Sequence, residues 1–157
     1  AVREACNAGT FLGPSIRAAG RTICMTGGHG NRFGRVADGI DELVKAVREQ
    51  VHAGSDLIKI MATGGVMTPG VNPEDAHYSA EEIAAGIHEG HRFHKTCASH
   101  VQGTEGILNA VRVGIDSIEH DIFMNEQCVE EMLEAGTYLA PTIAALQNIL
   151  AGADKVP

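Results

Sequence analysis

Hydrophobic and polar positions along the chain alternate between helical and extended patterns. Residues 41–53 place Leu43, Val44, Val47 and Val51 on one helical face, end at Gly54 and lead into the apolar run Leu57-Ile-Lys-Ile-Met61. The spacing predicts an amphipathic helix followed by a buried strand. Ser79-Ala-Glu-Glu82 is typical of a capping box and predicts a helix that runs to about Phe93.

The same alternation continues along the rest of the chain. We expect strands at 96–100, 116–120 and 137–142, separated by helices at 105–113 and at 125–134, the last capped by Asn125, and a weaker strand at 15–18. Strands that alternate with helices predict an α/β fold with a parallel sheet, because parallel neighbours need a long crossover connection. About five strands are expected.

Two architectures fit this alternation. An open doubly wound sheet is one, but no G-x-G-x-x-G motif follows a strand to support a dinucleotide site. The other is a (β/α)8 TIM barrel, which normally takes about 250 residues, so this chain would be its central portion. The chain starts without Met inside a predicted helix and stops at 151–157 while another predicted helix is under way. We therefore expect residues 1–157 to form a single partial barrel domain, an excerpt of a longer protein.

Composition narrows the class of protein. Hydrophobic residues make up 44% and charged residues 20%, as in ordinary globular proteins. The formal charge of −8, without a stripe of Lys or Arg, disfavours nucleic acid as a partner. No apolar run approaches membrane-spanning length, and no signal-type segment opens the chain. Four widely spaced cysteines without a C-x-x-C motif indicate reduced thiols, and so a cytoplasmic location.

Three polar residues stand in or at the end of the apolar strands. Lys59 interrupts the run 57–61, while His100 and His120 end two later strands. Both barrels and open sheets place their sites at the carboxyl ends of strands, which favours a functional role for all three. Alternatively, Lys59 lies on an edge strand facing water, and each histidine is a hydrogen-bonded core residue.

The motifs around these residues resemble a known family. Lys59-Ile-Met-Ala-Thr-Gly-Gly65, Ala98-Ser-His100-Val-Gln-Gly-Thr-Glu-Gly106 and Asp116-Ser-Ile-Glu-His120 are similar to the central section of the amidohydrolase superfamily, in its imidazolonepropionase-like and prolidase-like branch. The resemblance implies a barrel with two divalent metal ions, usually zinc. It implies that Lys59 is carboxylated by CO2 and bridges both metals as a carbamate. His100 and His120 match the ligands of the second metal, and a metal-bound hydroxide would be the nucleophile.

The chain departs from the family pattern in two respects. The first-strand His-x-His pair and the eighth-strand Asp that carries the proton are absent from these 157 residues, and we expect both to lie outside this excerpt. In addition, aligning Gly54-Ser-Asp56 with Gly114-Ile-Asp116 puts Lys59 opposite Glu119 instead of His120. The sequence leaves open on which face of the sheet His120 lies.

Weaker signals come from loops and from one helix. His29, in the loop Gly27-Gly-His-Gly30, is either a substrate contact or an exposed loop histidine. Tyr78 is a second candidate for substrate contact, together with His77, although Tyr78 could instead pack ahead of the Ser79 cap. His88, His91 and His94 recur every three residues and are more typical of a solvated helix end than of a metal site.

Three functions remain open. The first is a metal-dependent amidohydrolase that acts on a small peptide-like substrate, of the prolidase, dipeptidase or carboxypeptidase type, or on a cyclic amide. The second is a barrel lyase or aldolase in which Lys59 forms a Schiff base, which leaves the histidines unexplained. The third is an inert fragment or interaction module. Besides a substrate, the expected partners are the remainder of its own barrel and a second copy in a homo-oligomer.

Overall fold

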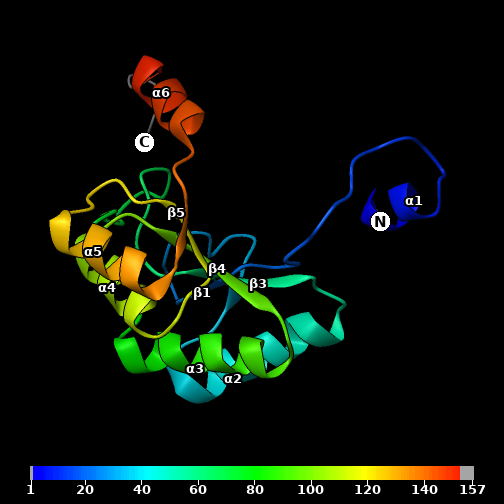
Figure 1. Ribbon diagram of the computed structural model, residues 1–157, viewed down its shortest axis with the longest axis horizontal. Coiled ribbons are helices and arrows are strands. Elements are labelled where there is room, and N and C mark those ends of the chain that lie inside the picture. The colour runs from blue at the N-terminus through cyan, green and yellow to red at the C-terminus, as the bar shows by residue number, and fades with distance from the viewer. Residues whose placement is uncertain (1, 153–157) are drawn as a thin grey trace.

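The structure is a computed structural model that describes residues 2–152 (Figure 1). In chain order, its elements are α1 (Val2–Asn7), β1 (Ile23–Cys24), β2 (Arg35–Val36), α2 (Gly39–His52), β3 (Leu57–Met61), α3 (Ala80–Arg92), β4 (Thr96–Val101), α4 (Thr104–Arg112), β5 (Ser117–His120), α5 (Glu126–Ala135), β6 (Tyr138–Ala140) and α6 (Ile143–Ala151). From β3 onward the predicted alternation is confirmed to within one or two residues at most element ends. The sequence predicted a helix already under way where the chain stops, at 151–157; α6 extends to Ala151, and residues 153–157 lie outside the described residues.

The described strands form one parallel sheet in the order β2-β1-β3-β4-β5-β6. The predicted parallel α/β architecture is thus confirmed, with six strands where the pattern suggested about five. The strand predicted at 15–18 is wrong, because those residues form no strand. The sheet instead begins with the two-residue strands β1 and β2, which are too short to show a period.

Local sequence signals account for the ends of several helices. Ser79 accepts a hydrogen bond from the Glu82 backbone N–H and the Glu82 side chain accepts one from the Ser79 backbone, which completes the predicted capping box of α3. Asn125 caps α5 by accepting from the backbone N–H of Cys128. Gly136 ends α5 with a φ of 71°, a left-handed conformation that glycine adopts without a steric penalty.

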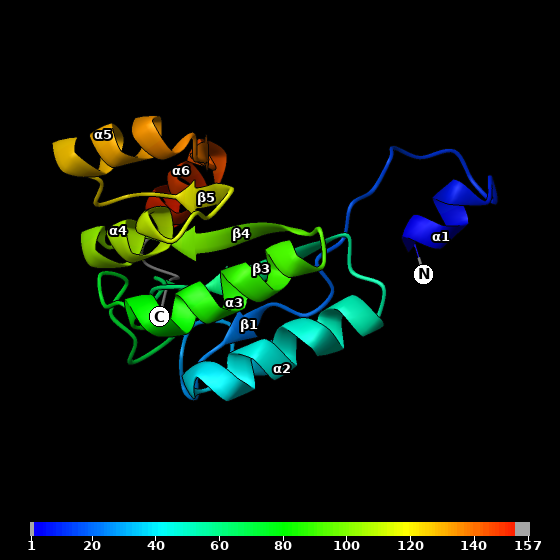
Figure 2. The same ribbon diagram turned by 60° about the horizontal axis from the view of Figure 1, so that its bottom comes forward.

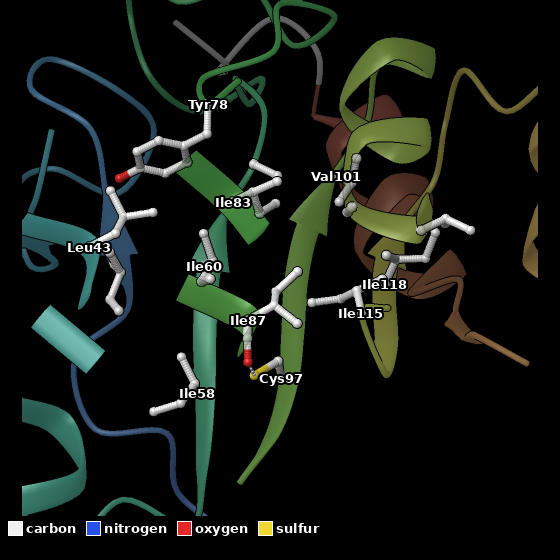
Figure 3. Packing of buried hydrophobic residues seen from close by; sticks show 14 of the residues in the cluster. Leu43, Ile58, Ile60, Tyr78, Ile83, Ile87, Cys97, Val101, Ile115 and Ile118 are labelled. Carbon is white, nitrogen blue, oxygen red and sulfur yellow. Dashed lines mark hydrogen bonds between the residues drawn. The ribbon is translucent and has the colours of Figure 1, made fainter. Parts of the chain in front are cut away.

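Helices α2 to α5 cover one face of the sheet, where they follow one another in chain order (Figure 2). The strands point alternate side chains at these helices, so that Ile58, Ile60, Val101 and Ile118 are fully buried between the layers (Figure 3). From the helices, residues such as Leu43, Ile83 and Ile87 complete this core. This packing fixes the order and register of the strands.

The other face of the sheet carries the residues that alternate with this core, among them Lys59, Ala98 and Glu119. Helix α6 stands clear of the sheet on the side away from α2 and α3, as Figure 1 shows. Within residues 2–152 no helix has the length and apolarity needed to cross a membrane.

Candidate active site

Lys59 lies in the middle of β3 with its side chain on the face opposite the helices. Lys59 pairs with Ala98 of β4, and Ala98 with Ser117 of β5, so Glu119, two residues beyond Ser117, projects from the same face. The Lys59 ammonium forms an ion pair with the Glu119 carboxylate. Burial lowers the pKa of Lys59, and Glu119 opposes that shift. Lys59 and Glu119, which the alignment of the two Gly-x-Asp segments makes equivalent positions, thus lie on the same face of the sheet.

His100 is buried near the end of β4, and the backbone fixes the orientation of its ring. Its Nε2 lies 2.7 Å from the carbonyl oxygen of Gly64, which can only accept, so Nε2 carries the proton and donates. Burial lowers the pKa of His100 to about 3, and the ring is neutral at physiological pH. The lone pair of a neutral ring protonated at Nε2 is on Nδ1. A metal ion at His100 would therefore bind through Nδ1.

A left-handed backbone resolves on which face of the sheet His120 lies. Strict alternation after Glu119 would direct His120 toward the helices, but its φ is 78°, and that of Asp121 is 55°. These values are unusual for residues other than glycine, and such residues cluster at functional sites. The turn brings His120 to the side of His100, where the ring centroids are 4.7 Å apart. The His120 Nδ1 is hydrogen-bonded to the hydroxyl of Thr142, the residue before α6.

His29 joins the same cluster from the loop after β1. Its ring stacks on that of His100 with centroids 4.4 Å apart, and its Nδ1 is 2.7 Å from the hydroxyl of Thr68. This close approach depends on Gly65, where an added Cβ would lie 2.6 Å from ring atoms of His29. His29 is thus half-buried among site residues rather than exposed in a loop.

The two adjacent residues His77 and Tyr78 have different surroundings. Tyr78 is 3% exposed in the hydrophobic core, donates its hydroxyl to the carbonyl of Ala37 at 2.9 Å and is not brought to the histidines. His77 is also buried, and its Nδ1 has no hydrogen-bond partner among residues 2–152. His77 lies against Gly28, the residue before His29, since an added Cβ at Gly28 would be 2.9 Å from the His77 Nδ1. Burial lowers the pKa of His77, and His29 adds to the shift.

The donors at this end of the sheet suit a divalent metal ion. His100 and His120 are neutral imidazoles, the form that binds zinc, and the second ring nitrogen of each is hydrogen-bonded to a neighbour, as is usual for metal-ligating histidines. Lys59, on the neighbouring strand, is largely removed from water. The described residues thus fit one side of a metal site.

Comparisons with known proteins decide the family. The sequence model of the amidohydrolase family matches residues 1–156. The chain belongs to the amidohydrolase family. It is 32% identical to the ochratoxinase of Aspergillus niger, in an alignment covering 96% of this chain and 36% of that protein. It is 27% identical to an uncharacterized protein of Mycobacterium tuberculosis over 90% of this chain and 38% of that protein.

Solved structures of the family extend this likeness to three dimensions. A Xaa-Pro dipeptidase with bound methionine in its active site matches with a TM-score of 0.93 and 34% identity, over 98% of this chain and 41% of that one. The A. niger ochratoxinase matches with a TM-score of 0.89 and 31% identity, over 96% and 40%. The six-stranded sheet is accordingly the central portion of an amidohydrolase TIM barrel. The chain spans about two-fifths of the length of these relatives.

Sequence reasoning missed further polar residues that follow the carboxyl ends of the strands. Asp121 is 5% exposed, neither of its carboxylate oxygens has a partner among residues 2–152, and burial raises its pKa to about 6. The Gln102 side-chain oxygen is likewise buried without a partner in that range. Both follow directly after strand residues, at 101 and 120, and that position was the available signal. Thr142 gave no such signal, since only the fold brings it to His120.

A second group of possible metal donors lies at the opposite end of the strands. One donor atom each from His91, Cys97 and Asp116 lies within 4.8 Å of the others. However, an oxygen of Asp116 already accepts hydrogen bonds from the Cys97 backbone N–H and from His91, each at 2.7 Å. Burial raises the pKa of the Cys97 thiol to about 12, which disfavours the thiolate that binds metal. We interpret this group as a structural contact.

Proposed function

We propose that this chain provides the central strands of a barrel enzyme that hydrolyses the C–N bond of a small amide with the help of two divalent metal ions, zinc in the first instance. The observation that carries the proposal is the convergence of His100 and His120. Each ring has one nitrogen hydrogen-bonded to its surroundings and the other available. Such an arrangement, beside a lysine in an apolar strand, supports metal binding better than any other chemistry available to these residues.

Within this proposal His100 and His120 hold the second metal, and Lys59 is carboxylated. The neutral amine of Lys59 attacks CO2, a C–N bond forms, and the proton lost from nitrogen passes to solvent. Burial of Lys59 favours the neutral amine, whereas its ion pair with Glu119 favours the ammonium. The product is an anion that a nearby cation stabilises, which makes carboxylation and metal binding mutually dependent.

The remaining roles follow from the positions of the side chains. When bound, the metal ions supply an activated water and polarise the scissile carbonyl. Gly64 and Thr142 hold the rings of His100 and His120 in the orientation that leaves one nitrogen available. We propose that His29 contacts the substrate, and its stacking on His100 at the edge of the cluster supports this role.

A peptide-like substrate is supported by the relatives. One structural neighbour is a Xaa-Pro dipeptidase, and another is a prolidase complexed with N-methylphosphonate-L-proline, which is 30% identical. We propose a dipeptide as the substrate, with a cyclic amide as the alternative. The four cysteines are all free thiols, which supports the proposed cytoplasmic location.

The test is to purify the complete protein with zinc and bicarbonate, measure its metal content, and screen dipeptides that vary at each position. We expect bound zinc and dipeptide hydrolysis, both lost on removal of metal by a chelator. Borohydride reduction with carbonyl substrates separates the Schiff-base alternative, because trapping of Lys59 would contradict the metal mechanism. A protein that neither binds zinc nor cleaves any amide would be the inert module.

A further inference from the structure

A cavity of about 140 Å³ separates the histidine cluster from helix α6. Its floor is formed by His29, His100 and His120. Its walls and roof are formed mainly by apolar side chains: Val66 and Met67 from the loop after β3, and Ala145, Leu146 and Ile149 from α6, with Gln102 at one side. Apart from the histidines, none of these lining residues has an ionisable side chain.

Helix α6 presents one defined face to this cavity. Thr142, Ala145, Leu146 and Ile149 follow the spacing i, i+3, i+4, i+7, which places them on one side of a helix. Thr142 is hydrogen-bonded to His120, and the other three residues line the cavity. Leu146 and Ile149 are half-buried, whereas Leu150 of the same helix is 75% exposed.

The size and lining of the cavity limit what it can hold. An apolar cavity of about 150 Å³ in a protein interior accommodates a benzene molecule. A charged group placed under α6 would lose its hydration without gaining an ionic partner from the roof. The cavity therefore suits an aromatic or branched aliphatic group of about six carbons.

We infer that this cavity binds an apolar side chain that flanks the scissile amide of the substrate, and that Leu146 and Ile149 of α6 determine that preference. The inference rests on the proposed function and names its substrate class: amides with a large apolar side chain next to the bond that is cleaved. Because Thr142, the residue immediately before α6, is hydrogen-bonded to His120, the roof of the cavity is held next to that ring. The bound side chain would thus lie beside the reacting bond.

The first test compares Leu146→Asn with Leu150→Asn in the complete protein. Both variants place the same residue in the same helix, one facing the cavity and one facing solvent. For dipeptides with Phe or Leu beside the scissile bond, we expect Leu146→Asn to lower kcat/KM by tenfold or more. For the matching Gly dipeptides the loss should stay below threefold, and Leu150→Asn should change neither. Equal losses for both substrate classes would overturn the inference.

The second test does not depend on catalysis. Fluorobenzene is titrated into the metal-free protein and followed by ¹⁹F NMR. We expect saturable binding in the wild type and in Leu150→Asn, and binding at least tenfold weaker in Leu146→Asn. If the wild type cleaves no amide but binds fluorobenzene in this way, the proposed function fails and the cavity assignment stands. Hydrolysis without fluorobenzene binding overturns the cavity assignment alone.

Discussion

The two ends of the parallel strands differ in how their polar groups are paired. At the amino end, Asp56 immediately precedes β3 and Asp116 immediately precedes β5. The Asp56 carboxylate accepts a hydrogen bond from the backbone N–H of Ala18 at 2.8 Å, and the Asp116 carboxylate accepts one from that of Cys97 at 2.7 Å. Each also contacts a basic side chain, that of Arg3 or His91. The Asp of each Gly-x-Asp segment thus pairs with polar groups at the amino end of the sheet in the same way.

At the carboxyl end, polar groups are buried without such pairing. His77, Gln102 and Asp121 each have buried polar atoms that lack partners among residues 2–152, whereas Ser55 is the one such case near the amino end. Among non-glycine residues with positive φ, His120, Asp121 and Thr142 lie at the carboxyl end, whereas His94 lies before β4 at the amino end. Unpaired buried groups and strained backbone both reduce stability, and proteins retain them where function requires them. The comparison therefore assigns stability to the amino end and chemistry to the carboxyl end, as in other TIM barrels.

The largest effect on activity should come from replacing Lys59 at the carboxyl end of the sheet. We expect Lys59→Ala to lose the metal and to reduce activity on the order of 10³-fold or more, because metal catalysis contributes several kcal/mol to the barrier. Stability in urea should change little by comparison. Metal analysis and kcat/KM on the complete protein provide the measurement.

Lys45→Ala is the matched control, since Lys45 is an exposed lysine of α2. It should leave metal content and rate unchanged. Full metal content and full rate in Lys59→Ala would show that Lys59 is structural.

A smaller effect at the same end should come from Thr142→Val, which keeps the shape of the side chain and removes the hydroxyl that contacts His120. We expect zinc affinity to fall about 10–100-fold, the usual cost of losing a group that orients a metal ligand. Competition with a chromophoric chelator measures it. Thr142→Ser should restore most of the affinity, and failure of this rescue would mean that the hydroxyl does not orient His120.

The sequence predicted the order of the candidate site residues along the strands better than the faces on which they lie, and His120 shows why. The order of Lys59, His100 and His120 along successive strands was readable because apolar runs and caps such as Ser79 and Asn125 define the elements. The face on which His120 lies was not, since alternation assumes extended backbone and cannot signal a φ of 78°. The assignment needed the structure.

Two further differences have similar causes. Side chains in a loop do not alternate regularly between two faces. The sequence therefore could not show that His77 is near His29 while Tyr78 packs in the core. At 15–18, the short segment Ser15-Ile-Arg-Ala18 was expected to form a weak strand. In the structure Ala18 only exchanges hydrogen bonds with Asp56. These hydrogen bonds of Ala18 alone do not make residues 15–18 a strand of the sheet.

The amino end can be tested with Asp116→Ala, which removes the acceptor of the Cys97 backbone N–H and of His91. We expect the free energy of unfolding to fall by about 1–3 kcal/mol, the cost of losing a charged hydrogen-bond partner. Zinc content and kcat/KM should be unchanged. Urea unfolding gives the stability, with Glu130→Ala, an exposed residue of α5, as the control.

The same variant checks whether His91, Cys97 and Asp116 bind metal. We add cobalt to the wild-type protein and to Asp116→Ala and record the absorption spectra. Neither protein should show a charge-transfer band from a cobalt-bound Cys97 thiolate. Such a band would show that the amino end is also a metal site and would remove the distinction between the two ends.

The smallest effect concerns Glu89, near the end of α3 that leads to the amino end of β4. Arg92 and, to a lesser extent, Arg48 lower the pKa of Glu89 to about 2. A carboxylate whose pKa is lower in the folded state than the unfolded value of about 4.3 stabilises the protein above that value, and this contribution is lost as pH falls from about 4.3 toward 2. Both arginines are more than half exposed, so the contribution should be below about 1 kcal/mol. Urea unfolding of Glu89→Gln at pH 7 should show this loss, and the difference from wild type should shrink between pH 4 and pH 2, whereas Glu130→Gln should match the wild type throughout. A difference that stays constant down to pH 2 would mean that Glu89 acts through packing and not through its charge.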